Sequence, residues 1–367
     1  MPPLRVAVIG AGAFGRNHLR VYRELEVAQP QLVKLAALVE PVAERRSSFA
    51  ATYNIPTFAT LTELLAANLS LDAASICVPT IHHASVAEQL LLAGLDILIE
   101  KPFAATLAQA DHILALSHAQ GRIVAIGHLE RFNPAVTATL AALNQPMFFE
   151  SHRLSVFTPR SLDVDVVLDL MIHDLDIVLS LTKSPVREVR AVGLPILSPK
   201  TDIANVRVEF DSGCVANFTA SRVSTEQVRK LRLFQPHQYL SLDFARQELL
   251  TISVDPAVVA AAITASITAT AAAGSSPLPA PTTTAAARPT PEPSLPAHGE
   301  HPTAGLSLTK ADIPKGEPLR LELEDFLHAV RARTQPRVPA EAGREALSLA
   351  LAINDQIAAH AHRAGLL

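Results

Sequence analysis

Short apolar runs alternate with amphipathic stretches in the first third of the chain. The runs LRVAVIG, VKLAALVE, AASICVP, DILIEKP and RIVAIGH fall between residues 4 and 128 and are typical of buried strands. The stretches between them place apolar residues at helical spacing, as Leu19, Tyr22 and Leu25 illustrate. This rhythm predicts parallel β-α-β units in a doubly wound sheet, and we assign residues 1–128 to this first domain.

The pattern changes after Phe132. One long apolar helix is predicted from Val166 to Leu181, and runs with hairpin spacing follow it. These runs are VREVRAVGLPI, IANVRVEFDSGCVANFTASRV, RKLRLFQPHQYLSLDF and ELLTISV. The DSG sequence at 211–213 is typical of a hairpin turn. We therefore expect a second, α+β domain with an open, mainly antiparallel sheet, formed by residues 129–255 and 318–367.

Residues 256–317 differ from the rest in composition. They repeat Ala, Thr, Pro and Ser and contain few large apolar residues. Such a segment cannot bury enough surface to offset its ordering entropy, so we expect a flexible insertion. An alanine-rich helix over 257–273 is the alternative.

The charge balance argues against several classes of partner. Lys and Arg number 31 and Asp and Glu 35, and the net charge of −4 gives no general attraction to nucleic acid or anionic membranes. The sequence shows no secretory signal and no membrane span, so a cytoplasmic location is expected. Cys77 and Cys214 are too few for a disulfide framework or a cysteine metal site, and no metal is expected.

The sequence GAGAFG joins the first predicted strand to the first predicted helix and fits the pattern G-x-G-x-x-G. In that context the backbone and the helix amino end approach the diphosphate of a dinucleotide. The first candidates for cofactor binding are therefore Gly10, Gly12, Ala13, Phe14 and Gly15.

Glu40 closes the second predicted strand, where an acidic residue accepts hydrogen bonds from the ribose hydroxyls of NAD. A carboxylate there repels the additional phosphate of NADP, so NAD is the expected cofactor. Two alternatives stay open. Glu40 could be a solvated strand end, and Arg45 or Arg46 could receive a 2′-phosphate.

The run DILIEKPF ends abruptly in Glu100, Lys101 and Pro102. Ligands of doubly wound sheets bind beyond the carboxyl ends of the strands, which places Lys101 in the expected crevice.

The predicted helix over 166–181 is apolar nearly all round and therefore buried, except for one polar stripe. Asp169, His173, Asp176 and Ser180 share this face by their spacing. Buried charges need partners, so the stripe either pairs with core arginines or lines a wet cleft, and the sequence leaves both open. His173 titrates near neutral pH and has a carboxylate one turn away, which suits proton transfer.

These motifs together resemble the Gfo/Idh/MocA family of nicotinamide-dependent sugar oxidoreductases. The resemblance rests on GAGAFG, on VPTIHHASVAEQLLLAGLDILIEKP, on the D-x-x-x-H element of Asp169 and His173, and on FLHAVRARTQPRVPAEAGREALSLALAI. It covers nearly the whole chain apart from the insertion and implies an N-terminal Rossmann domain that binds NAD. One departure is Met171, where the family usually has glycine, and a narrower pocket or a shifted helix is expected there.

The resemblance also implies roles for individual residues. Lys101, Asp169 and His173 form the catalytic group. In the preferred interpretation His173 is the base, Asp169 orients its imidazole and Lys101 hydrogen-bonds the alcohol oxygen, while the alternative makes Lys101 the base. The residues implied to lie at the cofactor, besides the glycine-rich loop and Glu40, are Pro79, Thr80, His83, Glu100 and Lys101.

Within the family, segments such as GHLERFNPAV and RKLRLFQPHQYLSLDF look most like the branch that oxidises C3 of UDP-N-acetylglucosamine, towards a 3-amino sugar for lipid A. This implies a UDP-sugar substrate, a homo-oligomer (dimer or tetramer) and an aminotransferase that takes the product. The expected substrate-binding residues are Arg131, Asn133, Arg153, Arg160 and Asp176, with Arg222 and Lys230 as further cations for a diphosphate. The alternative for any one of these cations is an ordinary surface or salt-bridge residue. The alternatives are another sugar or inositol dehydrogenase of the family, or an NAD-sensing regulator without turnover.

Overall fold

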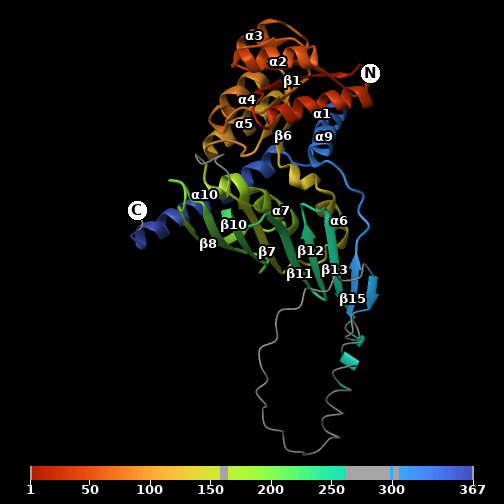
Figure 1. Ribbon diagram of the computed structural model, residues 1–367, viewed down its shortest axis with the longest axis vertical. Coiled ribbons are helices and arrows are strands. Elements are labelled where there is room, and N and C mark those ends of the chain that lie inside the picture. Colours follow the sequence, from red (N-terminus) through yellow and green to blue (C-terminus); the bar gives the residue numbers. More distant parts are fainter. Residues whose placement is uncertain are drawn as a thin grey trace, which may run out of the picture.

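The computed structural model describes residues 2–157, 164–255, 298–300 and 306–365, together with residues 257, 258, 260, 261 and 264. Two α/β units lie one above the other along the long axis of the molecule (Figure 1). The first contains the start of the chain, and the broad sheet of the second lies below it.

The first unit is a six-stranded sheet with the strand order β3-β2-β1-β4-β5-β6, in which all neighbouring strands run parallel. Its strands are β1 (Leu4–Ile9), β2 (Val33–Val39), β3 (Thr57–Phe58), β4 (Ala73–Ile76), β5 (Asp96–Glu100) and β6 (Val124–Gly127). The five longer strands match the apolar runs, and the predicted doubly wound sheet is confirmed. Strand β3 was not predicted, because its two residues are too few to show an alternation of apolar and polar positions.

Helices connect these strands on both faces of the sheet. They are α1 (Gly15–Ala28), α2 (Ala43–Tyr53), α3 (Leu61–Ala66), η1 (Thr80–His82), α4 (His83–Leu92) and α5 (Leu107–Gln120). Helix α1 buries Leu19, Tyr22 and Leu25 against the sheet, as their spacing predicts. Thr60 and Thr106 cap α3 and α5, because their side chains accept hydrogen bonds from backbone N–H groups in the first turn.

The second unit is a nine-stranded sheet with the order β14-β15-β13-β12-β11-β7-β10-β9-β8. Its strands are β7 (Phe148–Val156), β8 (Val186–Leu194), β9 (Ile203–Phe210), β10 (Val215–Ser224), β11 (Val228–Gln235), β12 (Gln238–Asp243), β13 (Glu248–Val254), β14 (His298–Glu300) and β15 (Leu306–Lys310). The one parallel pair among these described strands is β7 with β10, so the sheet is mainly antiparallel, as predicted.

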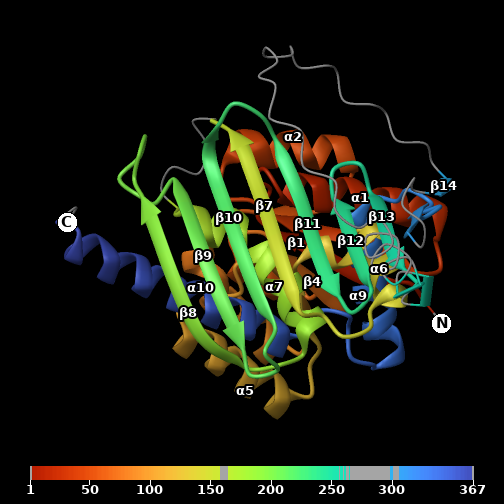
Figure 2. The same cartoon turned by 90° about the horizontal axis from the view of Figure 1, so that it is seen from below.

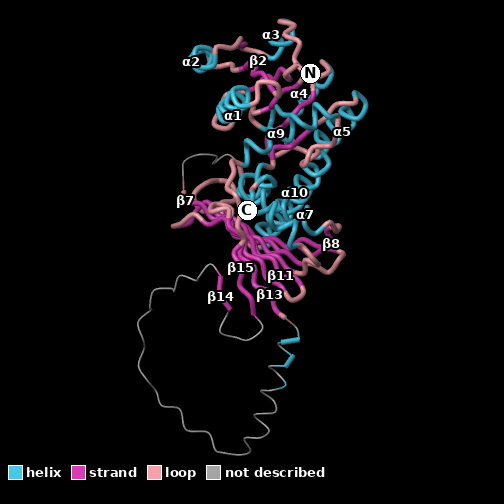
Figure 3. The backbone as a smooth tube through the Cα atoms, turned by 90° about the vertical axis from the view of Figure 1, so that its right-hand side faces the viewer, coloured by secondary structure: helices cyan, strands magenta, loops and turns pink. Residues whose placement is uncertain are grey.

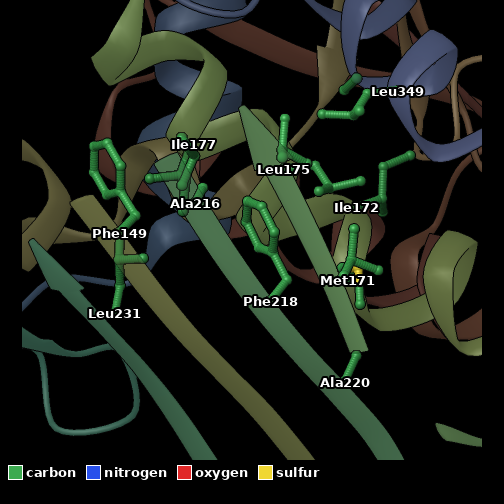
Figure 4. Packing of buried hydrophobic residues seen from close by; sticks show 14 of the residues in the cluster. Phe149, Met171, Ile172, Leu175, Ile177, Ala216, Phe218, Ala220, Leu231 and Leu349 are labelled. Atoms are coloured by element: carbon green, nitrogen blue, oxygen red, sulfur yellow. The ribbon is translucent and has the colours of Figure 1, made fainter. Parts of the chain in front are cut away.

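Helices cover one face of this sheet and separate it from the first unit (Figure 3). Further helical elements whose bounds the structure describes are η2 (Leu129–Phe132), α6 (Pro134–Ala142), η3 (Val167–Met171), α7 (Ile172–Thr182), α9 (Pro318–Ala332) and α10 (Ala340–Arg363). Side chains of α7 such as Leu175 and Ile177 pack on inward residues of the strands, among them Phe149, Phe218 and Leu231 (Figure 4). No described helix lies over the opposite face (Figure 2).

The stretch predicted as one helix over 166–181 has two parts. Val167–Met171 forms a π-helical turn, and the α-helix α7 begins only at Ile172. A π turn is wider than an α turn, so its side chains point in other directions than they would in a regular α-helix. Such turns are frequent at functional sites. Met171 points into the hydrophobic core and is almost fully buried, so it does not narrow the pocket (Figure 4).

The two C-terminal helices tie the units together, which differs from the expected division of the chain. Residues 318–332 were assigned to the second domain, but α9 packs Leu323, Phe326 and Leu327 into the core around α1. Helix α10 contributes Leu347 to the core of the first unit and Ile353 to that of the second. The apolar faces of both helices were evident in the sequence, but not which sheet each would meet.

The expected insertion also has a different boundary. Residues 306–310 were included in it, whereas the structure has them as β15, paired antiparallel with β13. The alternative of an alanine-rich helix over 257–273 falls mostly outside the described residues.

Candidate active site

The glycine-rich loop has the geometry of a dinucleotide cradle. A Cβ at Gly10, where φ is +94°, would lie 2.9 Å from the carbonyl oxygen of Cys77, and one at Gly15 would lie 1.9 Å from that of Gly10. A Cβ at Gly12 would meet nothing within 4 Å. Gly10 and Gly15 thus permit close packing of the backbone against neighbouring carbonyl groups. Gly12 leaves open space in which a diphosphate could approach the backbone. Ala13 and Phe14, at the tip of the loop, are exposed.

Glu40 lies beside this cradle at the carboxyl end of β2. One carboxylate oxygen accepts a hydrogen bond of 2.9 Å from the backbone N–H of Ala11, and the other accepts one of 3.0 Å from Val42. The Arg45 guanidinium comes within 4.0 Å of Glu40 Oε1, and Arg46 donates to the backbone carbonyls of Glu40 and Pro41. A buried carboxylate held in this way fits the ribose hydroxyls of a dinucleotide.

Pro79 and Thr80 follow β4 and lie at the same edge of the sheet, next to Cys77, whose carbonyl limits Gly10. His83 was expected near the cofactor, but it is buried. Its Nδ1 lies 3.0 Å from the carbonyl oxygen of Pro102, and its Nε2 lies 3.0 Å from that of Val78. The ring therefore joins the loops after β4 and β5, and its burial lowers the pKa of His83.

Glu100, the last residue of β5, is buried beneath the site. Its Oε1 lies 2.8 Å from Nε2 of His18 on α1, and a Cβ at Gly127 would lie 2.9 Å from its Oε2. The Glu100 carboxylate thus joins α1, which follows the glycine-rich loop, to the end of β5, next to Lys101.

Lys101 and Asp169 meet across the junction of the two units. The Lys101 ammonium donates a hydrogen bond of 2.6 Å to the backbone carbonyl of Asp169 and one of 3.4 Å to its carboxylate. The side chains remain 15% and 30% exposed, so both are accessible to a ligand. The strand end and the π-helical turn thereby place a cation and a carboxylate together beyond the carboxyl end of β5.

The His173 imidazole lies in the same region but does not receive the support expected for it. Its Nδ1 is buried and has no hydrogen-bond partner among the described residues, while Asp169 is engaged with Lys101. The π-helical turn explains the difference, because i, i+4 alignment holds for regular α-helix. Burial lowers the pKa of His173 well below its usual range, and the positive charges of Lys101, Arg153, His128 and Arg229 add to the effect. The imidazole is therefore neutral at neutral pH and able to accept a proton.

A second histidine, which the sequence analysis missed, faces His173. The two rings are perpendicular, with centroids 6.4 Å apart. His128 follows β6, is 1% exposed, and has no hydrogen-bond partner for either ring nitrogen in the part of the chain that the structure describes. Burial lowers the pKa of His128 as well.

Most of the expected substrate-binding residues are engaged inside the protein. Arg131 makes a bidentate ion pair with Asp176, at 2.7 and 2.9 Å. Arg153 is 3% exposed and is held by Asp174 and by Glu130. The buried Arg153 guanidinium is therefore not accessible to a diphosphate, whereas the Arg131 side chain remains 15% exposed beside its ion pair.

The other expected contacts also differ from the prediction. Asn133 caps α6 and donates to Glu130 and to the carbonyl of Phe244. Arg222 is buried 3.7 Å from Asp202, and Lys230 is exposed on the sheet face away from the helices. Arg160 lies outside the described residues. The polar stripe therefore divides: Asp176 pairs with a core arginine, whereas Asp169 and His173 face the crevice.

The crevice combines a dinucleotide cradle with a neutral imidazole and an ammonium group beyond the end of β5. This combination defines a nicotinamide-dependent oxidoreductase, because oxidation of an alcohol requires a hydride acceptor and a base for the hydroxyl proton. Among the described residues no group of three His, Cys, Asp or Glu side chains is arranged to hold a metal ion. Likewise, no described helix is long and apolar enough to cross a membrane.

Comparisons with known proteins agree with this class. Residues 4–128 match the model of the oxidoreductase family Gfo/Idh/MocA, NAD-binding Rossmann fold, and residues 136–235 match a Gfo/Idh/MocA C-terminal domain. The chain belongs to this family, and its first unit is the NAD-binding domain.

Two relatives illustrate the range of similarity. The chain is 33% identical over 361 residues to the UDP-N-acetylglucosamine 3-dehydrogenase of Acidithiobacillus ferrooxidans, covering 98% of this chain and 99% of the relative. A solved structure of that enzyme superimposes with a TM-score of 0.79 over 98% of this chain and 99% of its own. The inositol 2-dehydrogenase of Leifsonia xyli is 31% identical over 196 residues, covering 51% of this chain and 56% of the relative.

Proposed function

We propose that the protein oxidises the C3 hydroxyl of UDP-N-acetylglucosamine with NAD and yields the 3-oxo sugar nucleotide. The observation that carries this proposal is the 33% identity to a 3-dehydrogenase along essentially the full length of both chains. The Lys101, Asp169 and His173 arrangement supports it, since an ammonium group paired with a carboxylate lies beyond the end of β5 and an imidazole lies on the adjoining helix.

His173 is the base in this proposal. Bound NAD supplies the hydride acceptor for the hydrogen on C3. The proton of the C3 hydroxyl goes to the imidazole, which is uncharged before the reaction because burial and the surrounding cations lower the pKa of His173. Two electrons leave C3 with the hydride, the C–O bond becomes a carbonyl, and the proton remains on His173 until it exchanges with solvent.

Lys101 donates a hydrogen bond to the same oxygen and stabilises the negative charge that develops there. Its donors already point to two oxygens of Asp169, which holds the ammonium group in place. Asp169 is therefore a positioning residue for Lys101 rather than for the imidazole. The alternative in which Lys101 is the base requires it to release these contacts.

The experiment that tests the proposal incubates the purified protein with NAD and a panel of nucleotide sugars, free sugars and inositol. The absorbance of the reduced cofactor reports turnover, and borodeuteride traps the carbonyl so that the label can be located. Deuterium at C3 of UDP-N-acetylglucosamine supports the proposal. Deuterium at C4 or C6, or turnover of inositol or a free sugar in its place, supports the alternative of another dehydrogenase of the family, and NAD binding without any turnover supports a regulator.

The 3-oxo product has a carbonyl that suits transamination, so an aminotransferase is the proposed next enzyme on the way to a 3-amino sugar for lipid A. We place this sequence of reactions in the cytoplasm. The sheet face without helices is the proposed interface of a homo-oligomer, and light scattering of the purified protein measures its state.

A further inference from the structure

One guanidinium at the site lacks the carboxylate partners that the neighbouring arginines have. Arg229 lies near the start of β11, directly opposite Arg153 of β7 in the antiparallel register. Residues opposite each other in such a pair share a face of the sheet, and Arg229 lies on the same side of β11 as the buried Leu231 and Leu233. Arg229 thus lies on the helix-covered face of the sheet. Its neighbour across the strand pair is Arg153, which contacts Asp174 in the first turn of α7.

The surroundings of the two arginines differ in their partners. Arg153 donates hydrogen bonds to two carboxylates, those of Asp174 and Glu130. No carboxylate lies within ion-pair distance of Arg229 in the described part of the chain. Its contact is with the Gln227 side-chain oxygen, at 3.0 Å from Nη2 and 3.2 Å from Nε in the amide orientation that satisfies both groups.

The electrostatics follow from this difference. Burial and the charge of Arg153 lower the pKa of Arg229, and the more distant Glu130 and Asp174 only partly oppose them. Two guanidiniums directly opposite one another repel, and a half-buried charge without a counter-ion is unfavourable. An anion placed against Arg229 would remove both penalties.

Arg229 also lies near the helix that carries His173, because Arg153, directly opposite it, pairs with Asp174 in the first turn of α7. Its charge is among those that lower the pKa of His173, so the two side chains lie within electrostatic reach of each other. Unlike Arg153, which is buried, Arg229 is only half-buried. A substrate whose hydroxyl contacts His173 would therefore have its remaining groups close to this guanidinium.

We propose that Arg229 binds the phosphate of the sugar-nucleotide substrate, taking the role that the sequence suggested for Arg131 and Arg153. This inference rests on the proposed function. A guanidinium offers two parallel N–H donors that match phosphate oxygens, and the ion pair is strongest where water is partly excluded. Arg229 is thus a specificity-determining residue that separates nucleotide sugars from free sugars.

Arg229→Gln and Arg229→Lys are compared with wild-type protein and with Arg232→Gln. Arg232 is a guanidinium on the same strand, but it lies on the other face and pairs with Glu150, which makes it a matched control. The KM for UDP-N-acetylglucosamine and the Kd for UDP, measured by calorimetry with NADH bound, are expected to rise about 10- to 100-fold in Arg229→Gln. The kcat should change little, Arg229→Lys should recover part of the affinity, and Arg232→Gln should match wild type.

The two proposals fail in different ways. If wild-type protein turns over UDP-N-acetylglucosamine and Arg229→Gln keeps its KM and its affinity for UDP, the assignment of Arg229 is wrong and the proposed function stands. An equal rise of KM in Arg232→Gln would also overturn the assignment. If wild-type protein neither binds UDP nor turns over a UDP-sugar, the proposed function fails and this inference fails with it.

Discussion

Two charged clusters at the junction of the units use the same residue types in opposite ways. Asp169 and His173 belong to one, with Lys101, while Asp174 and Asp176 belong to the other, with Arg153 and Arg131. In the second cluster every charge meets an opposite charge inside the protein. In the first, the side chains are accessible and a ring nitrogen lacks a partner. Charged side chains whose hydrogen bonds are all made inside the protein therefore stabilise the fold. Accessible side chains with unused hydrogen-bonding atoms remain available to a substrate.

The largest expected effect is on turnover in the accessible cluster. His173→Ala and Lys101→Ala should each lower kcat by about 100- to 10,000-fold, because each removes a group that handles the proton or the developing charge. NAD affinity should stay unchanged in His173→Ala, since the glycine-rich loop, Glu40 and the other residues expected at the cofactor are untouched. Steady-state kinetics and NAD titration measure the two quantities. A variant with near wild-type kcat would remove that residue from the chemistry.

The saturated cluster should respond in stability instead. Asp174→Ala leaves the buried Arg153 with Glu130 as its one remaining ion-pair partner among the described residues, and loss of one member of a buried pair lowers the free energy of unfolding by about 3–5 kcal/mol. Asp169→Ala is the matched control, and removal of its accessible ion pair should change stability by less than about 1 kcal/mol. Urea denaturation measures both variants. Equal losses would contradict the distinction between the clusters.

A smaller change concerns the cofactor. Glu40→Ser should narrow the preference for NAD over NADP by about 10- to 100-fold, since the carboxylate that accepts the ribose hydroxyls and repels a phosphate is gone. Fluorescence titration of wild-type protein and variant with NAD and with NADP gives the ratio of the two dissociation constants. Tighter binding of NADP than of NAD by wild-type protein would transfer this role to Arg45 or Arg46.

The smallest expected effect is a shift in pH dependence. The reaction needs neutral His173, and a pKa lowered by burial and nearby cations places the acid limb of kcat/KM below about pH 6.5, the usual range of a histidine. Arg229→Gln removes one of those cations, so the pKa of His173 should rise and the acid limb should move to higher pH. Arg232→Gln should leave the limb in place. A shift to lower pH would exclude His173 as the titrating base.

The sequence predicted those features that depend on local periodicity. The five longer parallel strands, the cradle after β1 and the alternating strands of the second sheet all follow from patterns within a few residues. Local patterns could not show which sheet α9 would cover, or that Val167–Met171 would form a π-helical turn. Both outcomes depend on contacts between segments far apart in the chain.

The site was predicted unevenly for the same reason. The family resemblance grouped Lys101 with Asp169, and pairing of the polar stripe with core arginines was left open, but the sequence could not show that Arg131 and Arg153 would be those partners. A signal for Arg229 was present, because the alternation in VRKLRLF puts an arginine on the apolar side of the strand with Leu231 and Leu233. A charged side chain on the inward side of a strand needs a partner, and this requirement distinguishes Arg229 from Arg232, the other arginine of the strand.

Transfer of the hydrogen from C3 is the most direct measurement of the central claim. UDP-N-acetylglucosamine carrying deuterium at C3 is incubated with NAD and wild-type protein, and the reduced cofactor is examined by mass spectrometry and NMR. The claim predicts one deuterium per reduced nicotinamide, with formation of the labelled cofactor lowered about 100- to 10,000-fold in His173→Ala. Reduced cofactor without deuterium, or undiminished transfer in His173→Ala, would contradict it.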